Sequence, residues 1–252
     1  IYVHFPWCLV KCPYCDFLSI PVQKVNGQVP SAQQAREQLP HTRYADALIH
    51  EFRMRLLEFE GSNYEVGTLF FGGGTPSLWQ PEEIGRVIKV IREEAPRVAE
   101  SLEISVECNP SSVNLEFFER LLDAGVNRVS VGVQSLDKSR LKFLGREHDQ
   151  HQGLLAIEAA CRAGFSKVSA DLIYGVYQQS ADEACADLGN ILQYPLTHLS
   201  AYTLTIEPGT RFGALDRVGK LPLLSEDEVV RSFDQVSQFL SDSGFEHYEI
   251  SN

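Results

Sequence analysis

The chain has 252 residues, of which 44% are hydrophobic and 22% are charged. These proportions support one large domain with a buried core, or an α/β barrel of ordinary size. The 22 basic and 34 acidic residues give a formal net charge of −12, and no run of Lys or Arg offsets it. This balance argues against general nucleic-acid binding and against docking on an anionic membrane. No stretch approaches the roughly 20 apolar residues that a membrane-spanning helix needs.

Short β-rich runs alternate with amphipathic stretches along the chain, which indicates βα units and a parallel sheet. The predicted strands are residues 1–5, 68–71, 102–107, 128–133, 167–173 and 198–205. The predicted helices are residues 41–59, 81–94, 115–124, 139–143, 150–163, 181–192 and 225–243. Six such units could close into part of a barrel or open as a doubly wound sheet, and the periodicity alone does not choose.

The first predicted strand leads into the most informative segment, in which Cys8, Cys12 and Cys15 are spaced Cys-x-x-x-Cys-x-x-Cys. A structural zinc site needs four ligands, usually as two paired halves, and no second Cys-x-x-Cys pair follows. A [4Fe-4S] cluster normally takes four cysteines, so three leave one iron open. We expect the amino acid end of S-adenosylmethionine to fill that position, since such a cluster can cleave it to a carbon radical. The alternative is three ordinary surface thiols.

The cysteine segment is followed by residues 21–40, which are rich in Gln, Val and Pro. This composition predicts a flexible loop, and a solvated insertion is a more frequent role for such a loop than a functional lid. The chain begins at Ile1 and stops at Asn252, directly after a strand-like run. We therefore expect residues 1–252 to be one trimmed core domain whose parent protein continues at the C-terminal side.

Polar groups or bare backbone follow every predicted strand, and in parallel α/β folds ligands bind at this end of the sheet. The run Gly72-Gly73-Gly74-Thr75 exposes backbone and can approach an amino acid carboxylate or amine. It lacks the Lys and Ser/Thr of a phosphate-binding loop. Glu107 and Asp171 could hold ribose hydroxyls or an ammonium group, or act as ordinary caps. Arg146 could bind a carboxylate with two hydrogen bonds, or form a surface ion pair.

Taken together, these motifs resemble the radical S-adenosylmethionine superfamily and, within it, the oxygen-independent coproporphyrinogen III oxidase family. The matching blocks run along nearly the whole chain. They are YVHFPWC (2–8), KCPYCDF (11–17), FFGGGTPS (70–77), ECNP (107–110), SVGVQS (130–135), LGR (144–146), DLIYG (171–175) and LSAY (199–202).

The resemblance implies an α/β fold, namely a partial (β/α)₆ barrel with a mostly parallel sheet, helices outside and the cluster at its top. It implies that the ligands of the cluster are Cys8, Cys12 and Cys15. The residues implied to line the S-adenosylmethionine pocket are Tyr2, Gly73, Gly74, Thr75 and Glu107, with Tyr14 against the nucleoside. Positions that contact a further S-adenosylmethionine in the oxidase correspond to Gln134, Arg146 and Asp171. Thr205 is carried over from a loose local alignment.

Two subgroups share this framework: the oxidase, which decarboxylates two propionates of coproporphyrinogen III, and an oxidase-like heme chaperone (HemW type), which hands heme to client proteins. Asp16 and Phe17 follow the last cysteine, where the oxidase typically has a further cysteine. The runs LTIEPGT (204–210) and YEISN (248–252) are also of chaperone type. We therefore expect bound heme as cargo, heme-accepting client proteins as partners, and a reducing compartment, the cytoplasm.

The sequence is also compatible with other functions. The oxidase, acting on a porphyrinogen, is the alternative, and a radical enzyme with another substrate or a homodimer is compatible with the sequence. The heme site is not placed, because each candidate axial ligand is more often a capped or surface histidine. These candidates are His4, His148, His151, His198 and His247.

Overall fold

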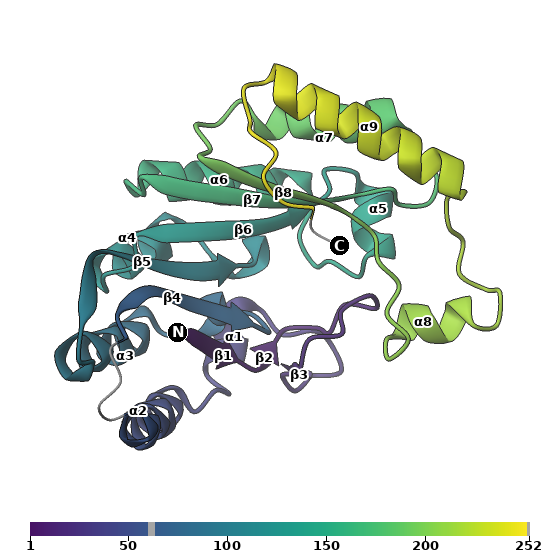
Figure 1. Cartoon of the computed structure of the whole chain (residues 1–252). Coiled ribbons are helices and arrows are strands. Elements are labelled where there is room, and N and C mark those ends of the chain that lie inside the picture. The colour runs from purple at the N-terminus through teal and green to yellow at the C-terminus, as the bar shows by residue number, and fades with distance from the viewer. Residues whose placement is uncertain (60–63, 251–252) are drawn as a thin grey trace.

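A computed structural model of the chain describes residues 1–59 and 64–250, so Ser251 and Asn252 of the YEISN motif lie outside the described residues. Six strands form one sheet in the order β1-β4-β5-β6-β7-β8, and every neighbouring pair is parallel (Figure 1). Their bounds are β1 Tyr2–Phe5, β4 Val66–Gly73, β5 Val98–Cys108, β6 Arg128–Gln134, β7 Lys167–Tyr174 and β8 His198–Thr203.

Helices lie between successive strands of the sheet, because parallel neighbours need a crossover connection, and two more helices, α8 and α9, follow β8. The helices are α1 Ala32–Arg36, α2 His41–Glu58, α3 Pro81–Glu94, α4 Leu115–Asp123, α5 Lys138–Phe143, α6 Gln150–Arg162, α7 Ala181–Ile191, α8 Arg211–Asp216 and α9 Glu226–Asp242, with short 3₁₀ turns at Pro76–Leu78 and Pro110–Ser112. In the described part of the chain β1 and β8 share no ladder, so the sheet stays open. The expected partial (β/α)₆ barrel is therefore confirmed.

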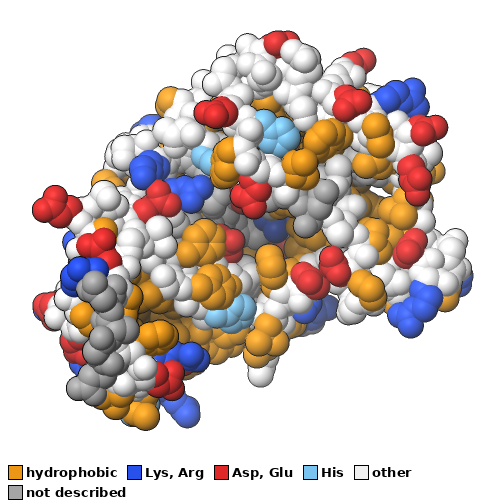
Figure 2. Space-filling model, viewed as in Figure 1, with side chains coloured by type: hydrophobic (Ala, Val, Ile, Leu, Met, Phe, Trp, Pro, Cys, Tyr) orange, Lys and Arg blue, Asp and Glu red, His pale blue; other side chains and the backbone are white. Residues whose placement is uncertain are grey.

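The core forms where the outer helices cover the sheet. Strands of this sheet are rich in fully buried apolar side chains, such as Leu69, Ile104 and Val131, because helices cover them. Helix α3 buries Ile84, Val87, Ile88 and Ile91, which recur at helical spacing on one face. On the face seen in Figure 2 the molecule is hollowed near its centre, with hydrophobic and acidic side chains around the hollow. Among the described residues, no helix has the length and apolar character that crossing a membrane requires.

Every predicted strand and helix is present, and most bounds differ by only one or two residues. Strands β4 and β5 are longer than predicted, whereas β8 ends at Thr203 and leaves Thr205 in the following loop. The turn at Glu207–Thr210 and the short helix α8 come soon afterwards, and neither was predicted.

The prediction of a flexible loop at residues 21–40 is wrong for residues 32–36, which form α1. Ser31 caps this helix, since its side chain accepts from the Gln34 N–H while the Gln34 side chain accepts from the Ser31 N–H. Ala35 is fully buried. A short second sheet of β2 (Trp7–Cys8) and β3 (Ile20–Pro21) precedes this segment. The polar composition of residues 21–40 therefore gave no indication of helix α1, which packs on the core.

Helix α1 also joins two loops at the carboxyl ends of the strands. The Nη2 of Arg36 donates to the carbonyl oxygens of Ser77 at 2.9 Å and Ser112 at 2.5 Å. Its guanidinium lies over the ring of Phe117, 4.9 Å from the centroid. The hydroxyls of Ser77 and Ser112 are 2.6 Å apart. Arg36 thus holds the loop after β4 against the loop after β5.

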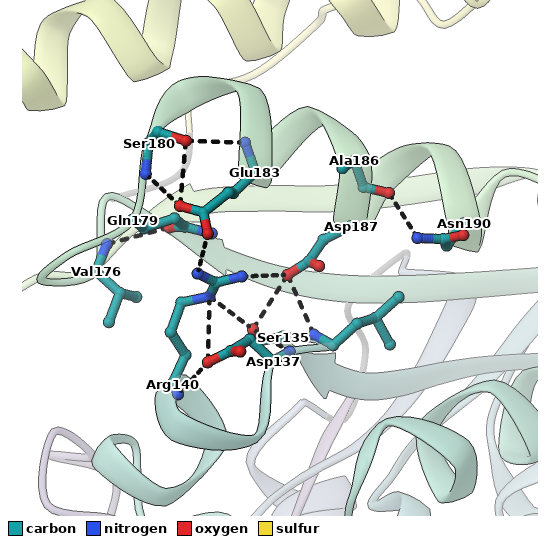
Figure 3. A network of polar contacts seen from close by, with 11 residues as sticks. Ser135, Asp137, Arg140, Val176, Gln179, Ser180, Glu183, Ala186, Asp187 and Asn190 are labelled. Carbon is teal, nitrogen blue, oxygen red and sulfur yellow. Dashed lines mark hydrogen bonds and ion pairs between the residues drawn. The ribbon is translucent and has the colours of Figure 1, made fainter.

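A polar network fixes the loop after β6 to helix α7. Figure 3 shows Asp187 and Glu183 pointing from α7 toward Arg140 of α5. Asp187 Oδ2 lies 3.8 Å from Nη2 of Arg140 and accepts hydrogen bonds from Ser135 Oγ and the Leu136 N–H, both at 3.1 Å. The side chains of Arg140 and Asp187 are only 11% and 10% exposed. The pair is therefore largely removed from water.

We expect Asp187→Ala to lower the free energy of unfolding by about 2–3 kcal/mol, because it leaves the Ser135 hydroxyl and the Leu136 N–H without their buried acceptor, while Arg140 keeps its partners Asp137 and Glu183. The matched control is Glu51→Ala, which removes an exposed ion pair with Arg55 and should cost less than about 1 kcal/mol. Urea unfolding of both variants measures the difference. Equal losses would contradict the importance assigned to this network.

Candidate functional site

A pocket opens at the carboxyl ends of the strands, and Cys8, Cys12 and Cys15 all line it. Cys8 ends the short strand β2, and its carbonyl oxygen accepts from the Val22 N–H at 2.9 Å. Cys12 and Cys15 are joined by a turn in which the Cys15 N–H donates to the Cys12 carbonyl at 3.2 Å. The three thiols are therefore presented to one space by a loop with defined backbone contacts.

Two distant segments hold this cysteine loop. The Phe212 N–H of α8 donates to the carbonyl oxygen of Pro13 at 2.8 Å. Gly145 packs against the ring of Pro13, where a Cβ would lie 2.6 Å from Cδ, and its φ of 67° also favours glycine. The Sγ of Cys12 lies 3.8 Å from Nη1 of Arg146. The LGR motif thus supports the loop through both its backbone and a cation.

Among the described residues, no three His, Cys, Asp or Glu side chains converge closely enough to hold a single metal ion. A four-iron cluster has a different requirement, because each cysteine binds its own iron. Burial raises the pKa of Cys8 to about 11, and the neighbouring thiols Cys12 and Cys15 add to this. Ionisation of the Cys8 thiol is therefore favoured by a cationic partner, and clustered iron would supply one. The residues present fit a cluster.

The glycine run lines the same pocket, beside the backbone that leads into Cys8. A Cβ on Gly74 would lie 2.5 Å from the Trp7 carbonyl oxygen, so no larger residue fits. The N–H of Gly74 donates to the Phe5 carbonyl at 2.7 Å, that of Thr75 to the Trp7 carbonyl at 2.8 Å, and that of Gly73 to Glu107 at 3.1 Å. With these N–H groups engaged, the run can offer a ligand its carbonyl oxygens. Because carbonyl oxygens accept hydrogen bonds, the glycine run favours the ammonium group of a ligand over a carboxylate.

Two carboxyl groups lie on the inner face of the sheet beside the glycine run. Burial raises the pKa of Glu107 to about 7, the charge of Asp171 adds to it, and the Gly73 N–H opposes it. Burial also raises the pKa of Asp171, although the hydroxyl of Ser130 donates to its Oδ1 at 2.8 Å. A ligand that brings a cation or hydroxyl donors would therefore be stabilised here.

The remaining wall combines a buried cation with a polar pair. Arg146 Nη2 donates to the Gly132 carbonyl at 2.7 Å, while its Nε is buried and has no partner among the described residues. The Tyr202 hydroxyl donates to Oε1 of Gln134 at 3.0 Å. Gln134 has a φ of 67°, a conformation that a non-glycine residue adopts at a cost. An unpaired guanidinium N–H in a pocket suits an anionic group such as a carboxylate.

Most of the predicted site residues meet in this one pocket. They are Cys8, Cys12, Tyr14, Cys15, Gly73, Gly74, Thr75, Glu107, Gln134, Arg146 and Asp171. Tyr2 does not line it: its ring stacks on Phe70 with centroids 6.1 Å apart, and it is 57% exposed. Thr205 lines an adjoining cavity of about 560 Å³, which shares Tyr14, Cys15 and Asp171 with the pocket.

Sequence reasoning missed Tyr202, which lines both cavities, and Cys108 and Gly132, which line the first. The signal for Tyr202 was present in the alternation along β8, since Ser200 and Tyr202 share the inner face of a strand. The close fit of Gly132 had no such signal. A Cβ there would lie 2.9 Å from Nε2 of Gln134, a contact that only the fold reveals.

The family model of the radical SAM superfamily matches residues 2–188, which is most of the chain. The chain belongs to the radical SAM superfamily. The resemblance inferred from the cysteine and glycine motifs is thereby confirmed, and the pocket described above is the one that carries the motifs of this superfamily.

Among curated relatives, the heme chaperone HemW of Escherichia coli (strain K12) is 36% identical to this radical SAM chain over 252 residues. The heme chaperone HemW of Haemophilus influenzae is 33% identical over 253 residues. Both alignments cover 100% of this chain and 61% of the relative, so the chain spans about three fifths of the length of these proteins. The solved structure of the radical SAM enzyme coproporphyrinogen III oxidase (HemN) from Escherichia coli matches with a TM-score of 0.78 at 28% identity, covering 97% of this chain and 52% of that one.

The raised pKa of Glu107 predicts a pH-dependent stability. Between its ordinary pKa of 4.5 and the folded value of about 7, the folded chain holds a proton that the unfolded chain has lost, so stability falls as pH rises through this window. The loss should total about 3 kcal/mol. We expect Glu107→Gln to remove this part of the pH dependence while keeping an acceptor for the Gly73 N–H. Urea unfolding across the window compares the two proteins, and parallel curves would refute the assignment.

Proposed function

We propose that this chain is the core of a heme chaperone, which binds heme, delivers it to client proteins, and carries a [4Fe-4S] cluster with an S-adenosylmethionine site. The observation that carries the proposal is the alignment of heme chaperones HemW over 100% of the chain, at 36% and 33% identity. The match to the oxidase is weaker in sequence, at 28% identity. Asp16, which stands where the oxidase typically has a further cysteine, supports the same choice.

The pocket supports the cofactor part of this proposal. Cys8, Cys12 and Cys15 would hold the cluster, and the chemistry that such a cluster supplies is reductive cleavage of S-adenosylmethionine. The carbonyl oxygens of Gly73 and Gly74 are suited to accept hydrogen bonds from the ammonium group of its amino acid part. The buried Nε of Arg146 is suited to its carboxylate or to that of a second ligand.

The other predicted contacts keep the roles that the resemblance implies. Glu107 and Asp171 have acceptor oxygens for ribose hydroxyls, and the half-buried ring of Tyr14, which lines the pocket, would lie against the nucleoside. Thr75 completes the glycine wall, and Gln134 is held by Tyr202 on the facing side. Tyr2 and Thr205 lie outside the lining of the first pocket, so any contact they make depends on a ligand that extends beyond it.

A second candidate is the oxidative decarboxylation of coproporphyrinogen III. It is favoured by the arrangement of Gln134, Arg146 and Asp171 around one pocket and by the fold match to the oxidase. The adjoining cavity of about 560 Å³ would give a substrate room beside the S-adenosylmethionine site. For a heme chaperone, the corresponding partners are heme and heme-accepting proteins.

The proposed setting follows from the cysteines and the charge. All six cysteines are free thiols in the described part of the chain, and oxygen-sensitive thiolate sites belong in a reducing compartment, here the cytoplasm. The net charge of −12 disfavours nucleic acid as a partner. A homodimer is compatible with the open sheet.

We expect Cys12→Ala to abolish the brown absorbance of the reconstituted protein, because one iron loses its thiolate. Cys161→Ala is the matched control, since this thiol lies on α6 outside the pocket, and it should leave the absorbance unchanged. Iron and sulfide analysis with absorbance spectroscopy measures both. Full cluster content in Cys12→Ala would contradict the ligand assignment.

The natural full-length protein, with its cluster reconstituted anaerobically, separates the two functions. We expect it to bind heme at micromolar concentration and to form no protoporphyrinogen from coproporphyrinogen III with S-adenosylmethionine and a reductant. Absorbance titration follows the first reaction, and product analysis follows the second. Absence of heme binding with an intact cluster would overturn the chaperone proposal, and product formation would establish the oxidase.

A further inference from the structure

Gln134 ends β6 in a strained conformation, and its side chain is largely buried. Its φ of 67° lies in the left-handed region, which a residue with a side chain adopts only at a cost in free energy. The ladder between β6 and β7 shifts its register between Gly132 and Gln134, so Val133 is an extra residue on β6. Strained residues and bulges persist where neighbouring contacts hold them, and both gather at functional sites. The contacts that hold Gln134 are therefore candidates for a role in the pocket.

His148 holds the peptide group that precedes Gln134. Its Nε2 lies 2.9 Å from the carbonyl oxygen of Val133, which also accepts from the Ser135 N–H at 2.8 Å. A carbonyl oxygen only accepts, so Nε2 of His148 carries the proton. The side chain is 4% exposed, and it lines neither the pocket of the three cysteines nor the adjoining cavity. His148 therefore acts on the backbone of Gln134 from outside the pocket.

The backbone on either side of this peptide group is fixed as well. The Nη2 of Arg146 donates to the carbonyl oxygen of Gly132 at 2.7 Å. On the other side Asp187 accepts from the hydroxyl of Ser135 at 3.1 Å, as Figure 3 shows. These contacts fix the two ends of the bulge, and the imidazole fixes its centre.

The side-chain amide of Gln134 is oriented by a phenol. The hydroxyl of Tyr202 donates to Oε1 of Gln134 at 3.0 Å. Burial raises the pKa of Tyr202, so the phenol keeps its proton and remains a donor. The amide nitrogen faces Gly132, where a Cβ would lie 2.9 Å from Nε2 of Gln134 and 3.5 Å from Nη2 of Arg146. Two nitrogen donors thus border one small space in the pocket.

The direction of this amide decides which ligand group the space can hold. The two ends of an amide are similar in shape but opposite in polarity. With Tyr202 bonded to the oxygen, the amide N–H and the guanidinium of Arg146 face the same space, which suits an anionic oxygen. Without the phenol, the amide can rotate by half a turn and offer its oxygen to the guanidinium. That contact would engage Arg146 and place an acceptor where an anionic ligand needs a donor.

We propose that Tyr202 and His148 are positioning residues that aim the amide N–H of Gln134 at an anionic oxygen of the ligand. Tyr202 acts through the side chain of Gln134, and His148 acts through its backbone. The inference rests on the proposed function, in which the ligand is S-adenosylmethionine and the anionic oxygen belongs to its carboxylate. It adds two residues to the site, one of which lies behind the pocket lining.

The test uses the natural full-length protein with its cluster reconstituted anaerobically, and it measures binding of radiolabelled S-adenosylmethionine by equilibrium dialysis. Tyr202→Phe should weaken binding by roughly 10–100-fold, the range of one hydrogen bond to a charged group. His148→Leu should weaken it by at least about tenfold. His148→Gln should restore most of the affinity, because its amide N–H can replace Nε2 as the donor to Val133.

A double-mutant cycle separates positioning from a general effect on the fold. Gln134→Ala should weaken binding by itself, and it identifies the ligand site that the amide serves. In the Gln134→Ala background, Tyr202→Phe and His148→Leu should weaken binding no further, because the group that they orient is gone. Effects that add to that of Gln134→Ala would show that the two residues act on binding by another route, and the inference would be overturned.

Tyr44→Phe is the matched control, since it removes a half-buried phenol hydroxyl that donates to the His4 carbonyl outside the pocket. It should leave the affinity unchanged. Iron content and urea unfolding show whether each variant is loaded and folded, and Tyr202→Phe decides the outcome if His148→Leu does not fold. Unchanged affinity in Tyr202→Phe or in Gln134→Ala would overturn the inference while the proposed function stands. A wild type that binds no S-adenosylmethionine with its cluster intact would instead contradict the proposed cofactor site.

Discussion

The arrangement of the site depends on one close backbone contact, between the glycine run after β4 and the chain that links β1 to the cysteines. Gly74 and Thr75 donate to the carbonyl oxygens of Phe5 and Trp7, and no Cβ fits at Gly74. Cys8 follows Trp7 directly, so this contact fixes the first thiol against the glycine wall. A larger residue at Gly74 would separate the wall from the loop, and both halves of the site would be lost together.

The pocket also contains ionisable side chains that are buried without enough hydrogen-bond or charge partners from the chain itself. Glu107 and Asp171 are disfavoured as carboxylates by burial, and the guanidinium of Arg146 has an unpaired N–H. Such groups cost folding free energy, which a ligand with complementary charges can return on binding. A zwitterionic amino acid has both charges. The pocket is therefore built for a ligand rather than for the stability of the fold.

Much of this could be predicted from the sequence, because the informative signals are local. The cysteine spacing, the glycine run and the alternation of strands with helices depend on neighbouring residues. Together with the family resemblance that these motifs carry, they pointed to eleven of the residues that line the pocket. Burial of Ala35, the contact of Arg36 with two loops and the inward position of Tyr202 arise from residues far apart in the chain. The engagement of the N–H groups of the glycine run could not be predicted either, since their acceptors, Phe5, Trp7 and Glu107, belong to other strands.

The contacts of the cysteine loop have a consequence for biosynthesis. The Pro13 carbonyl accepts a hydrogen bond from the Phe212 N–H of α8, and the Sγ of Cys12 lies 3.8 Å from Nη1 of Arg146. These partners emerge from the ribosome long after the cysteines do. The contacts of the loop with its near neighbours, such as Val22, can form early, but those with Arg146 and Phe212 must wait until α8 has been synthesised. A cluster bound by these cysteines would therefore be fully enclosed only after α8 has left the ribosome.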